Sequence, residues 1–306
     1  MSVTLIENFR AVFYAPFYAA FALGAYKDEG LDVQLEMSSS ADKTLTGVLT
    51  GDRHVSWGGP MRLLHALDEN PKNGLVSFCE VVGRDPFYLL GREKNENFCM
   101  NDLSGKAVAV VSEVPTPWYC LQNDLRIAGI DPSTIRRTPN RSMSENLELL
   151  RTGEVDVVQV FEPLAHIISE EGFGHIWYAA SSRGPTSYTT LNTTRGFLER
   201  NPDIALRMTR AIYRTQKWIT AHTGHELAES ISDYFPEIKL KTLAACCRNY
   251  KIGGVWNNTP IQQRAGFERL SDAMYVCKAI RTKFEYEDLS DMHFAEMVIH
   301  EDPPSI

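Results

Sequence analysis

The order of hydrophobic and polar positions changes period several times in the first sixty residues. An apolar run at 3–7 and an alternating run at 31–37 are typical of strands, whereas residues 16–29 place apolar side chains nearly all round a helix. A further helix over 43–50 and a third strand over 55–57 follow. This alternation of strands and helices predicts a parallel sheet with covering helices.

The same alternation stops near residue 85 and then starts again. A helix over 61–68 and a strand over 75–82 complete the first series, and Asp85-Pro86 then interrupts it. The expected elements of the second series are an extended segment at 87–91, strands at 106–111, 155–161 and 175–179, and helices at 117–128, 144–152 and 163–171. A strand-like stretch at 188–192 leads into a tail with helices expected at 202–221, 225–232, 240–250 and 262–276. The restart predicts two α/β lobes, with the helical tail returning to the first.

Length and charge narrow the possible functions. The chain of 306 residues has room for about two domains of ordinary size. A net charge of −8 argues against nucleic acid as a partner, because phosphate binding needs a basic face. The sequence has no apolar run of about 18 residues, so no direct membrane insertion is expected. The opening residues do not resemble an export signal. We therefore expect a cytoplasmic protein if the chain is complete as written, and a periplasmic one if a signal was removed.

Five motifs occur in the order that is characteristic of one protein family. They are LGAYKDEGLDV at 23–33, LTGD at 49–52, DLSGKAVA at 102–109, GEVDV at 153–157 with Glu162-Pro163 after it, and Asn201-Pro202. The chain resembles the nitrate, sulfonate and taurine substrate-binding proteins, a superfamily that includes the fungal thiamine-pyrimidine synthases. The resemblance implies a type II periplasmic-binding-protein fold, an α/β fold of two lobes with mixed sheets joined by two crossing strands. We expect the crossings near 84–87 and 186–190, lobe one at 1–84 plus 190–306, and lobe two at 85–189.

In that fold a ligand binds between the lobes, at the carboxyl ends of the strands. Glycines there let a ligand approach the backbone, and aromatic side chains supply apolar walls. The candidate binding residues at these ends are Arg10, Tyr14, Trp57, Gly58, Gly59, Met61, Glu113, Thr116, Trp118, Glu162 and Tyr188. Core packing is the alternative for the two tryptophans, and a tight turn is the alternative for the glycines.

Two of these candidates, Glu113 and Glu162, are carboxylates at strand ends of the second lobe. Together they would suit an amine, a nitrogen-containing ring or hydroxyl groups, and would repel a bare anion unless a nearby arginine neutralised them. The alternative is that they are solvated or stabilise a helix N-terminus. This pattern favours a ligand that is aromatic or contains nitrogen.

The resemblance implies a solute-binding protein that captures a small organic molecule by cleft closure and works with an ABC-type permease, without a cofactor. The alternative is a cytosolic enzyme on the same scaffold, such as a thiamine-pyrimidine-precursor synthase-like protein or a decarboxylase. The fungal synthases carry a lysine after the third strand and a cysteine cluster near the return crossing, and this chain has neither at 58–65 or 181–191. A related desulfinase uses a cysteine in the first loop, where this chain has Tyr14. These differences favour a binding protein, whereas six cysteines and the absence of an export signal favour the enzyme.

Overall fold

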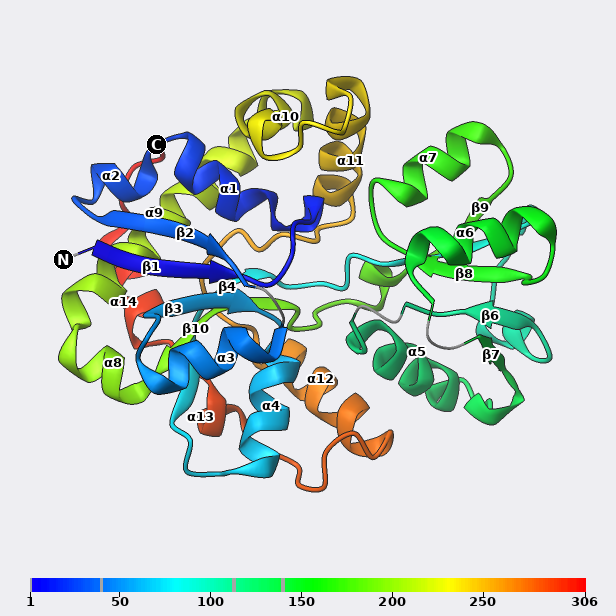
Figure 1. Cartoon of the computed structure of the whole chain (residues 1–306), viewed down its shortest axis with the longest axis horizontal. Helices are drawn as coiled ribbons and strands as arrows, with labels where there is room; N and C mark the ends of the chain where they lie inside the picture. The colour runs from blue at the N-terminus through cyan, green and yellow to red at the C-terminus, as the bar shows by residue number, and fades with distance from the viewer. Residues whose placement is uncertain (1, 39–40, 112–113, 139–140) are drawn as a thin grey trace.

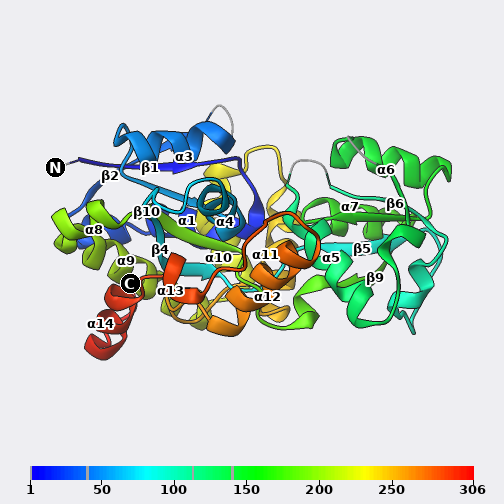
Figure 2. The same ribbon diagram turned by 90° about the horizontal axis from the view of Figure 1, so that it is seen from below.

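The structure is a computed structural model of the chain, and it describes residues 2–38, 41–111, 114–138 and 141–306. Its α/β architecture contains two sheets that lie side by side along the long axis of the molecule (Figure 1). Both termini lie on the side of the first sheet in the two views (Figures 1 and 2). Within the described parts of the chain, none of the helices is both long and apolar enough to cross a membrane.

The first sheet has the strand order β2-β1-β3-β10-β4. Its strands are β1 (Ser2–Glu7), β2 (Asp32–Met37), β3 (Val55–Gly58), β4 (Leu75–Val82) and β10 (Thr189–Thr194). Strand β1 pairs in parallel with β2 and β3, whereas β10 runs antiparallel between β3 and β4. Every residue of β3 and β4 is buried, as expected for strands that are covered on both faces.

The second sheet has the order β7-β6-β8-β5-β9. Its strands are β5 (Tyr88–Gly91), β6 (Ala107–Ala109), β7 (Arg136–Thr138), β8 (Val157–Val160) and β9 (His175–Ala179). Strand β6 is parallel to β7 and β8, and β5 is antiparallel to β8 and β9. Each sheet is therefore mixed, and each contains one antiparallel strand between neighbours, as the predicted fold class requires.

The helices cover the two sheets and the junction between them. They are α1 (Ala15–Ala22), α2 (Ala25–Asp28), α3 (Ala41–Thr50), α4 (Pro60–Glu69), α5 (Thr116–Ile127), α6 (Met143–Thr152), α7 (Leu164–Glu171), α8 (Arg195–Arg200), α9 (Pro202–Ala221), α10 (Gly224–Ile231), α11 (Leu240–Ile252), α12 (Arg264–Val276), α13 (Tyr286–Leu289) and α14 (His293–Glu301). Helices α5, α6 and α7 accompany the second sheet, while α11 and α12 lie over the junction in both views (Figures 1 and 2). The single helix expected over 16–29 is in fact two, because Gly24 adopts a left-handed φ of 77° between α1 and α2.

Two crossings connect the sheets, over residues 83–87 and 180–188. The crossings bond to each other: the N–H of Thr186 donates to the carbonyl of Gly83 at 2.8 Å, and the N–H of Ala180 donates to that of Phe87 at 2.9 Å. A third segment joins them, because the N–H of Gly83 donates to the carbonyl of Val255 at 3.0 Å. Three backbone segments therefore meet at the junction, and two of them, the crossings, connect the sheets covalently.

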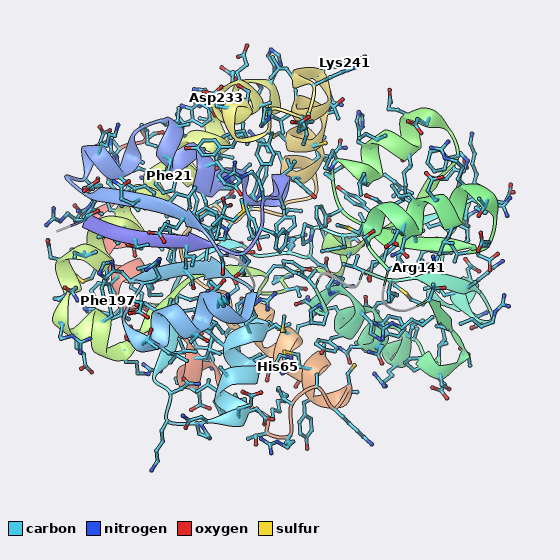
Figure 3. All side chains as sticks on the ribbon, viewed as in Figure 1. Phe21, His65, Arg141, Phe197, Asp233 and Lys241 are labelled. Carbon is cyan, nitrogen blue, oxygen red and sulfur yellow. The ribbon has the colours of Figure 1, made fainter. Side chains whose placement is uncertain are left out.

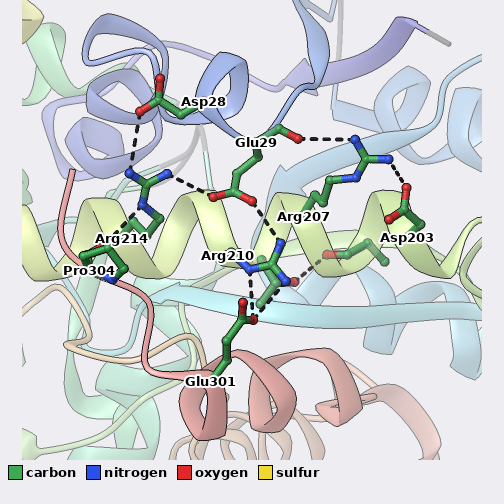
Figure 4. Close-up of polar contacts among 10 residues, drawn as sticks. Asp28, Glu29, Asp203, Arg207, Arg210, Arg214, Glu301 and Pro304 are labelled. Atoms are coloured by element: carbon green, nitrogen blue, oxygen red, sulfur yellow. Dashed lines mark hydrogen bonds and ion pairs between the residues drawn. The ribbon is translucent and has the colours of Figure 1, made fainter.

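The C-terminal end of the chain is fastened to helix α9 by ion pairs. Arg210 contacts both Glu29 and Glu301 at 2.9 Å, and Arg214 contacts Glu29 at 3.0 Å (Figure 4). Arg214 also donates to the carbonyl of Pro304 at 3.1 Å. The carboxylate of Glu29 therefore links α9 to the end of α2, and the last residues of the tail pack on the side of the first sheet.

Candidate ligand cleft

A small cavity lies where the carboxyl ends of strands from the two sheets meet. Its volume is about 20 Å³, and it is lined by Asn8, Phe9, Phe13, Tyr14, Gly59, Met61, Arg62, Val114, Thr116 and Tyr188. We call it the junction cavity. The first seven of these residues follow strands β1 and β3, Val114 and Thr116 lie just before and at the start of α5, and Tyr188 lies in the second crossing. A cavity of this volume holds about one water molecule. An organic ligand can therefore enter only if the surrounding segments move apart.

Aromatic rings from both sides meet at the junction cavity. The ring of Phe13 lies 4.3 Å from that of Tyr14 and 5.2 Å from that of Phe161, which follows strand β8. Phe161 also packs edge-on against Phe87 of the first crossing at 5.1 Å. Phe13 contacts Tyr188 at 6.1 Å. These edge-to-face contacts give the cavity an apolar wall that is shared between the two halves of the molecule.

Two polar atoms at the cavity are buried without a hydrogen-bond partner among the described residues: Oδ1 of Asn8 and Oη of Tyr188. A buried polar atom without a partner costs free energy, so such atoms commonly find one in a ligand or a water. The oxygen of Asn8 is an acceptor, and the tyrosine hydroxyl can both donate and accept. The pair is suited to a ligand that carries an N–H or O–H group.

The side chain of Arg62 brings a positive charge to the same cavity. Arg62 lies in the first turn of α4, whose start has Gly59 as the N-cap residue and Pro60 at the first helical position. Burial raises the pKa of the Tyr14 hydroxyl, and the charge of Arg62 opposes this shift only in part. Tyr14 therefore remains a neutral hydroxyl, and among the described lining residues Arg62 is the cation beside neutral donors and acceptors.

Five residues predicted from the sequence line the junction cavity: Tyr14, Gly59, Met61, Thr116 and Tyr188. The other predicted residue next to it is Gly58, because a Cβ there would come within 2.8 Å of the Asn8 amide nitrogen. Glycine at this position therefore lets the Asn8 side chain lie beside the cavity. Glu113 lies outside the described residues.

The two predicted tryptophans and Arg10 lie elsewhere. Trp57 is fully buried and stacks on Phe17 with ring centroids 4.6 Å apart, which is the core-packing alternative. Trp118 is buried in the core of the second sheet, and the guanidinium of Arg137 lies 5.1 Å from the centre of its ring. Arg10 is exposed and pairs with Glu7 at 2.7 Å.

Glu162 is fully buried, but it faces helix α11. Its Oε1 accepts from the amide of Asn249 at 2.8 Å, and its Oε2 accepts from the backbone N–H of His166 at 2.8 Å. Its own N–H donates to the hydroxyl of Tyr250 at 2.9 Å. Burial raises the pKa of the Glu162 carboxyl, while the amide of Asn249 and the N–H of His166 oppose that shift. Glu162 therefore joins the end of strand β8 to a helix of the C-terminal tail.

A second contact, between helices α5 and α12, lies on the other side of the junction. Arg126, near the end of α5, donates to Sγ of Cys277 at 3.2 Å, just after the end of α12. The thiol of Cys277 in turn lies 3.6 Å from the carbonyl oxygen of Tyr119. The junction cavity thus lies between two sets of contacts, one through α11 and one through α12, and both helices belong to the tail.

Asn8 and Arg62 line the cavity but are not among the candidates predicted from the sequence. Both follow strands whose ends were identified: Asn8 comes directly after β1, and Arg62 lies four residues beyond the end of β3. Counting one helical turn past each strand end would have included Arg62, since the first turn of α4 faces the cavity.

Comparison with known proteins agrees with this architecture. YtlA of Bacillus subtilis, named as a binding protein, is 27% identical over 301 residues, which cover 98% of this chain and 90% of YtlA. The aliphatic sulphonate binding protein SsuA of Escherichia coli has a similar structure, with a TM-score of 0.76, 13% identity, and coverage of 94% of this chain and 91% of SsuA. The desulfurization enzyme DSZB has the same fold, with a TM-score of 0.70, 14% identity, and coverage of 98% and 100%.

A match to a family model identifies the family of this chain. The model described as NMT1/THI5 like matches residues 12–224, which is more than half of the chain. This match includes strands of both sheets and both crossings, and it agrees with the resemblance identified in the sequence. The chain belongs to the NMT1/THI5-like family.

Proposed function

We propose that this protein is a solute-binding protein that captures a small organic molecule and delivers it to an ABC-type permease. The observation that carries the proposal is the junction cavity, which takes its lining from both sides and contains two buried polar atoms without a partner among the described residues. The family and the likeness to the binding proteins YtlA and SsuA support it. The delivery step would place the protein where it meets its permease, on the outer side of the cytoplasmic membrane.

The proposal includes a division into two lobes, residues 1–84 with 190–306 and residues 85–189. Each lobe contains one sheet, apart from Thr189, the first residue of β10, and the two crossings connect them. Because so few segments cross, the lobes can rotate about them and open the cleft. A ligand that touches both lobes stabilises the closed form by its difference in affinity for the two forms. The cavity of about 20 Å³ then represents a closed arrangement that must widen to admit a solute.

The chemistry of the cavity supports a ligand with a flat apolar part and at least one N–H or O–H group. The rings of Phe13, Tyr14 and Tyr188 would pack on the flat part, while Oδ1 of Asn8 would accept from the donor. Arg62 would face an oxygen of the ligand. The sequence also favours an aromatic or nitrogen-containing ligand, but with Glu113 and Glu162 as its polar partners, whereas in this proposal the acceptor is Asn8.

The first test identifies the solute and follows its fate. Native mass spectrometry of the purified protein detects a bound molecule, which is then released by denaturation and analysed. We expect the molecule to be recovered unchanged. Recovery of a modified product, or of a covalent adduct on the chain, would instead support an enzyme on this scaffold, as DSZB is.

A second test uses two tyrosines in the same chemical situation. The hydroxyls of Tyr188 and Tyr26 are both buried without a partner among the described residues, but only Tyr188 lines the junction cavity. Tyr188→Phe should weaken binding of the identified solute by about 0.5–1.5 kcal/mol, as the loss of one neutral hydrogen bond does. Tyr26→Phe should leave the affinity unchanged. Equal affinities of all three proteins in calorimetry would remove Tyr188 from the site.

A further inference from the structure

A second concave surface, separate from the junction cavity, lies against the first crossing. We call it the crossing groove. Its volume is about 440 Å³, which is within the range of small-molecule sites. It is lined by Pro16, Arg84, Gln216, Ile219, Thr220, Lys251, Gly254, Trp256, Asn257, Asn258, Thr259 and Gln263. These residues come from α1, the first crossing, α9, the end of α11 and the segment that follows it.

The charge of the crossing groove is unusual for this chain. Its described lining contains two cations, Arg84 and Lys251, and no carboxylate, whereas the chain as a whole has a net charge of −8. Both cations are half-buried, and neither forms an ion pair with a described residue. Partly buried charges usually have a counterion, so two cations in one groove call for an anion.

The hydrogen bonds of the two cations are made to carbonyl oxygens. Arg84 donates through Nη1 to the carbonyl of Ser181 at 3.3 Å, and the guanidinium also lies beside Gly254. Lys251 donates to the carbonyl of Ile219 at 2.6 Å and to that of His222, near the end of α9. Burial lowers the pKa of the Lys251 ammonium, and the negative charge of Glu226 offsets this only in part. These contacts fix the positions of the cations, and neither cation touches a carboxylate of a described residue, although Glu226 acts on Lys251 from farther away.

The rest of the lining is suited to hydrogen bonding. Thr220, Asn258 and Gln263 are exposed. Asn257 is half-buried, and its amide nitrogen donates to the carboxylate of Glu80. Oε1 of Gln216 is buried with no partner among the described residues, while its amide nitrogen donates to the carbonyls of Glu80 and Thr259 at 3.1 and 3.2 Å. The amide nitrogens of Gln216 and Asn257 already donate to protein oxygens, and the buried Oε1 of Gln216 is an acceptor. The donors that face an anion are therefore those of the two cations and of the exposed Asn258 and Gln263, which suit an anion with more than one oxygen-bearing group.

We infer that the crossing groove binds a small organic dianion, of the dicarboxylate class, at a site separate from the junction cavity. The two cations would each face one carboxylate, and the exposed amides of Asn258 and Gln263 would complete the hydrogen bonds. Because Arg84 belongs to the first crossing, a bound dianion would hold that crossing against helix α11. This inference does not depend on the proposed transport function, since it concerns different residues.

Succinate is the probe for the test. Calorimetric titration of the full-length protein with sodium succinate, against a sodium chloride control of equal ionic strength, should show saturable binding with one site per chain. Arg84→Gln and Lys251→Gln should each weaken it about tenfold or more, because each removes a charge-assisted contact. Lys241→Gln is the matched control: it removes the same charge from an exposed position on the same helix, where Figure 3 shows Lys241 at the outer end of α11. It should leave succinate binding unchanged.

Because Lys251 also bonds to the end of α9, its replacement can disturb folding. A further variant therefore tests the groove without removing that contact. Asn258→Asp changes an exposed residue to an acid of the same shape within the groove, and it should abolish succinate binding without lowering the melting temperature. Arg62→Gln distinguishes the two sites, because it changes the junction cavity and leaves the groove intact. The absence of saturable binding to the unmodified protein would overturn the inference. It would also be overturned if Arg62→Gln weakened binding while Asn258→Asp did not.

Discussion

Replacing Asn249 by alanine tests whether the contact between Glu162 and helix α11 holds the two lobes together. The amide of Asn249 donates to Oε1 of Glu162 at 2.8 Å, and the glutamate is fully buried. Its other oxygen keeps the bond from the N–H of His166, which follows it by four residues in the same lobe. Asn249→Ala therefore removes a bond between the proposed lobes and leaves one within a lobe.

The magnitude applies to the ionised Glu162 carboxylate, so the measurements are made at a pH above its raised pKa. A hydrogen bond to a charged group contributes about 1.5–3 kcal/mol. In an opened form both side chains would reach water, so this loss falls on the closed form alone. The ratio of closed to open protein should then fall by about 10- to 150-fold. Where the open form predominates without solute, the apparent affinity for the solute falls by the same factor.

Small-angle scattering and calorimetry measure the two expected effects. With the identified solute at a concentration that saturates the unmodified protein, Asn249→Ala should retain a larger radius of gyration and a weaker affinity. Lys241→Ala, an exposed change on the same helix, should match the unmodified protein in both measurements. If Asn249→Ala closed as fully and bound as tightly as the control, Glu162 would have no role in closure.

Two other buried ionisable residues near the crossings, Glu80 and Arg183, lead to separate predictions. Burial raises the pKa of Glu80 to about 7, above the unfolded value of about 4.5, so its contribution to stability is complete below pH 4.5 and is lost as the pH rises through 7. Chemical unfolding between pH 5 and 8 should show that Glu80→Gln reduces this pH-dependent loss by about 2.5 kcal/mol, and parallel curves would contradict the assignment. Arg183 pairs with both Asp85 and Asp124 with only 5% of its side chain exposed, so Arg183→Met should cost about 3–5 kcal/mol of unfolding free energy. Arg281→Met, at a position with 77% of the side chain exposed, should cost less than about 1 kcal/mol, and equal losses for the two variants would refute the reasoning.

Local signals in the sequence were sufficient to predict most of the regular elements. Helix α9 occupies 202–221 as expected, because Pro202 starts it and its apolar positions keep a helical period over 20 residues. Strand β4 likewise occupies 75–82. The pattern did not reveal strand β7, since Arg136–Thr138 is short and polar and is ordered by pairing with β6. Nor did it reveal helix α14 at 293–301, which packs on α9 and β4.

The candidate site was predictable only where a residue faces the cleft from its own strand end. Tyr14, Gly59 and Thr116 fit that rule, because strand topology alone brings them to the junction. Glu162 also lies at a strand end, but Asn249, which follows it by 87 residues, reaches it through the packing of a tail helix. Trp57 lies in a strand, where side chains alternate between the two faces of the sheet. The sequence does not predict which face Phe17 covers, because that depends on where helix α1 packs. Contacts of this kind are set by tertiary packing and are not encoded in local periodicity.

The place of β10 in the first sheet also determines an order of assembly. This strand lies between β3 and β4, although about a hundred residues separate β4 from it in the chain. While the chain emerges from a ribosome, the facing edges of β3 and β4 stay unpaired until residues 189–194 are available. The strands of the second sheet all lie within residues 88–179, so that sheet can pair completely while the first still lacks a central strand. The half of the molecule that begins the sequence is therefore the last to finish folding.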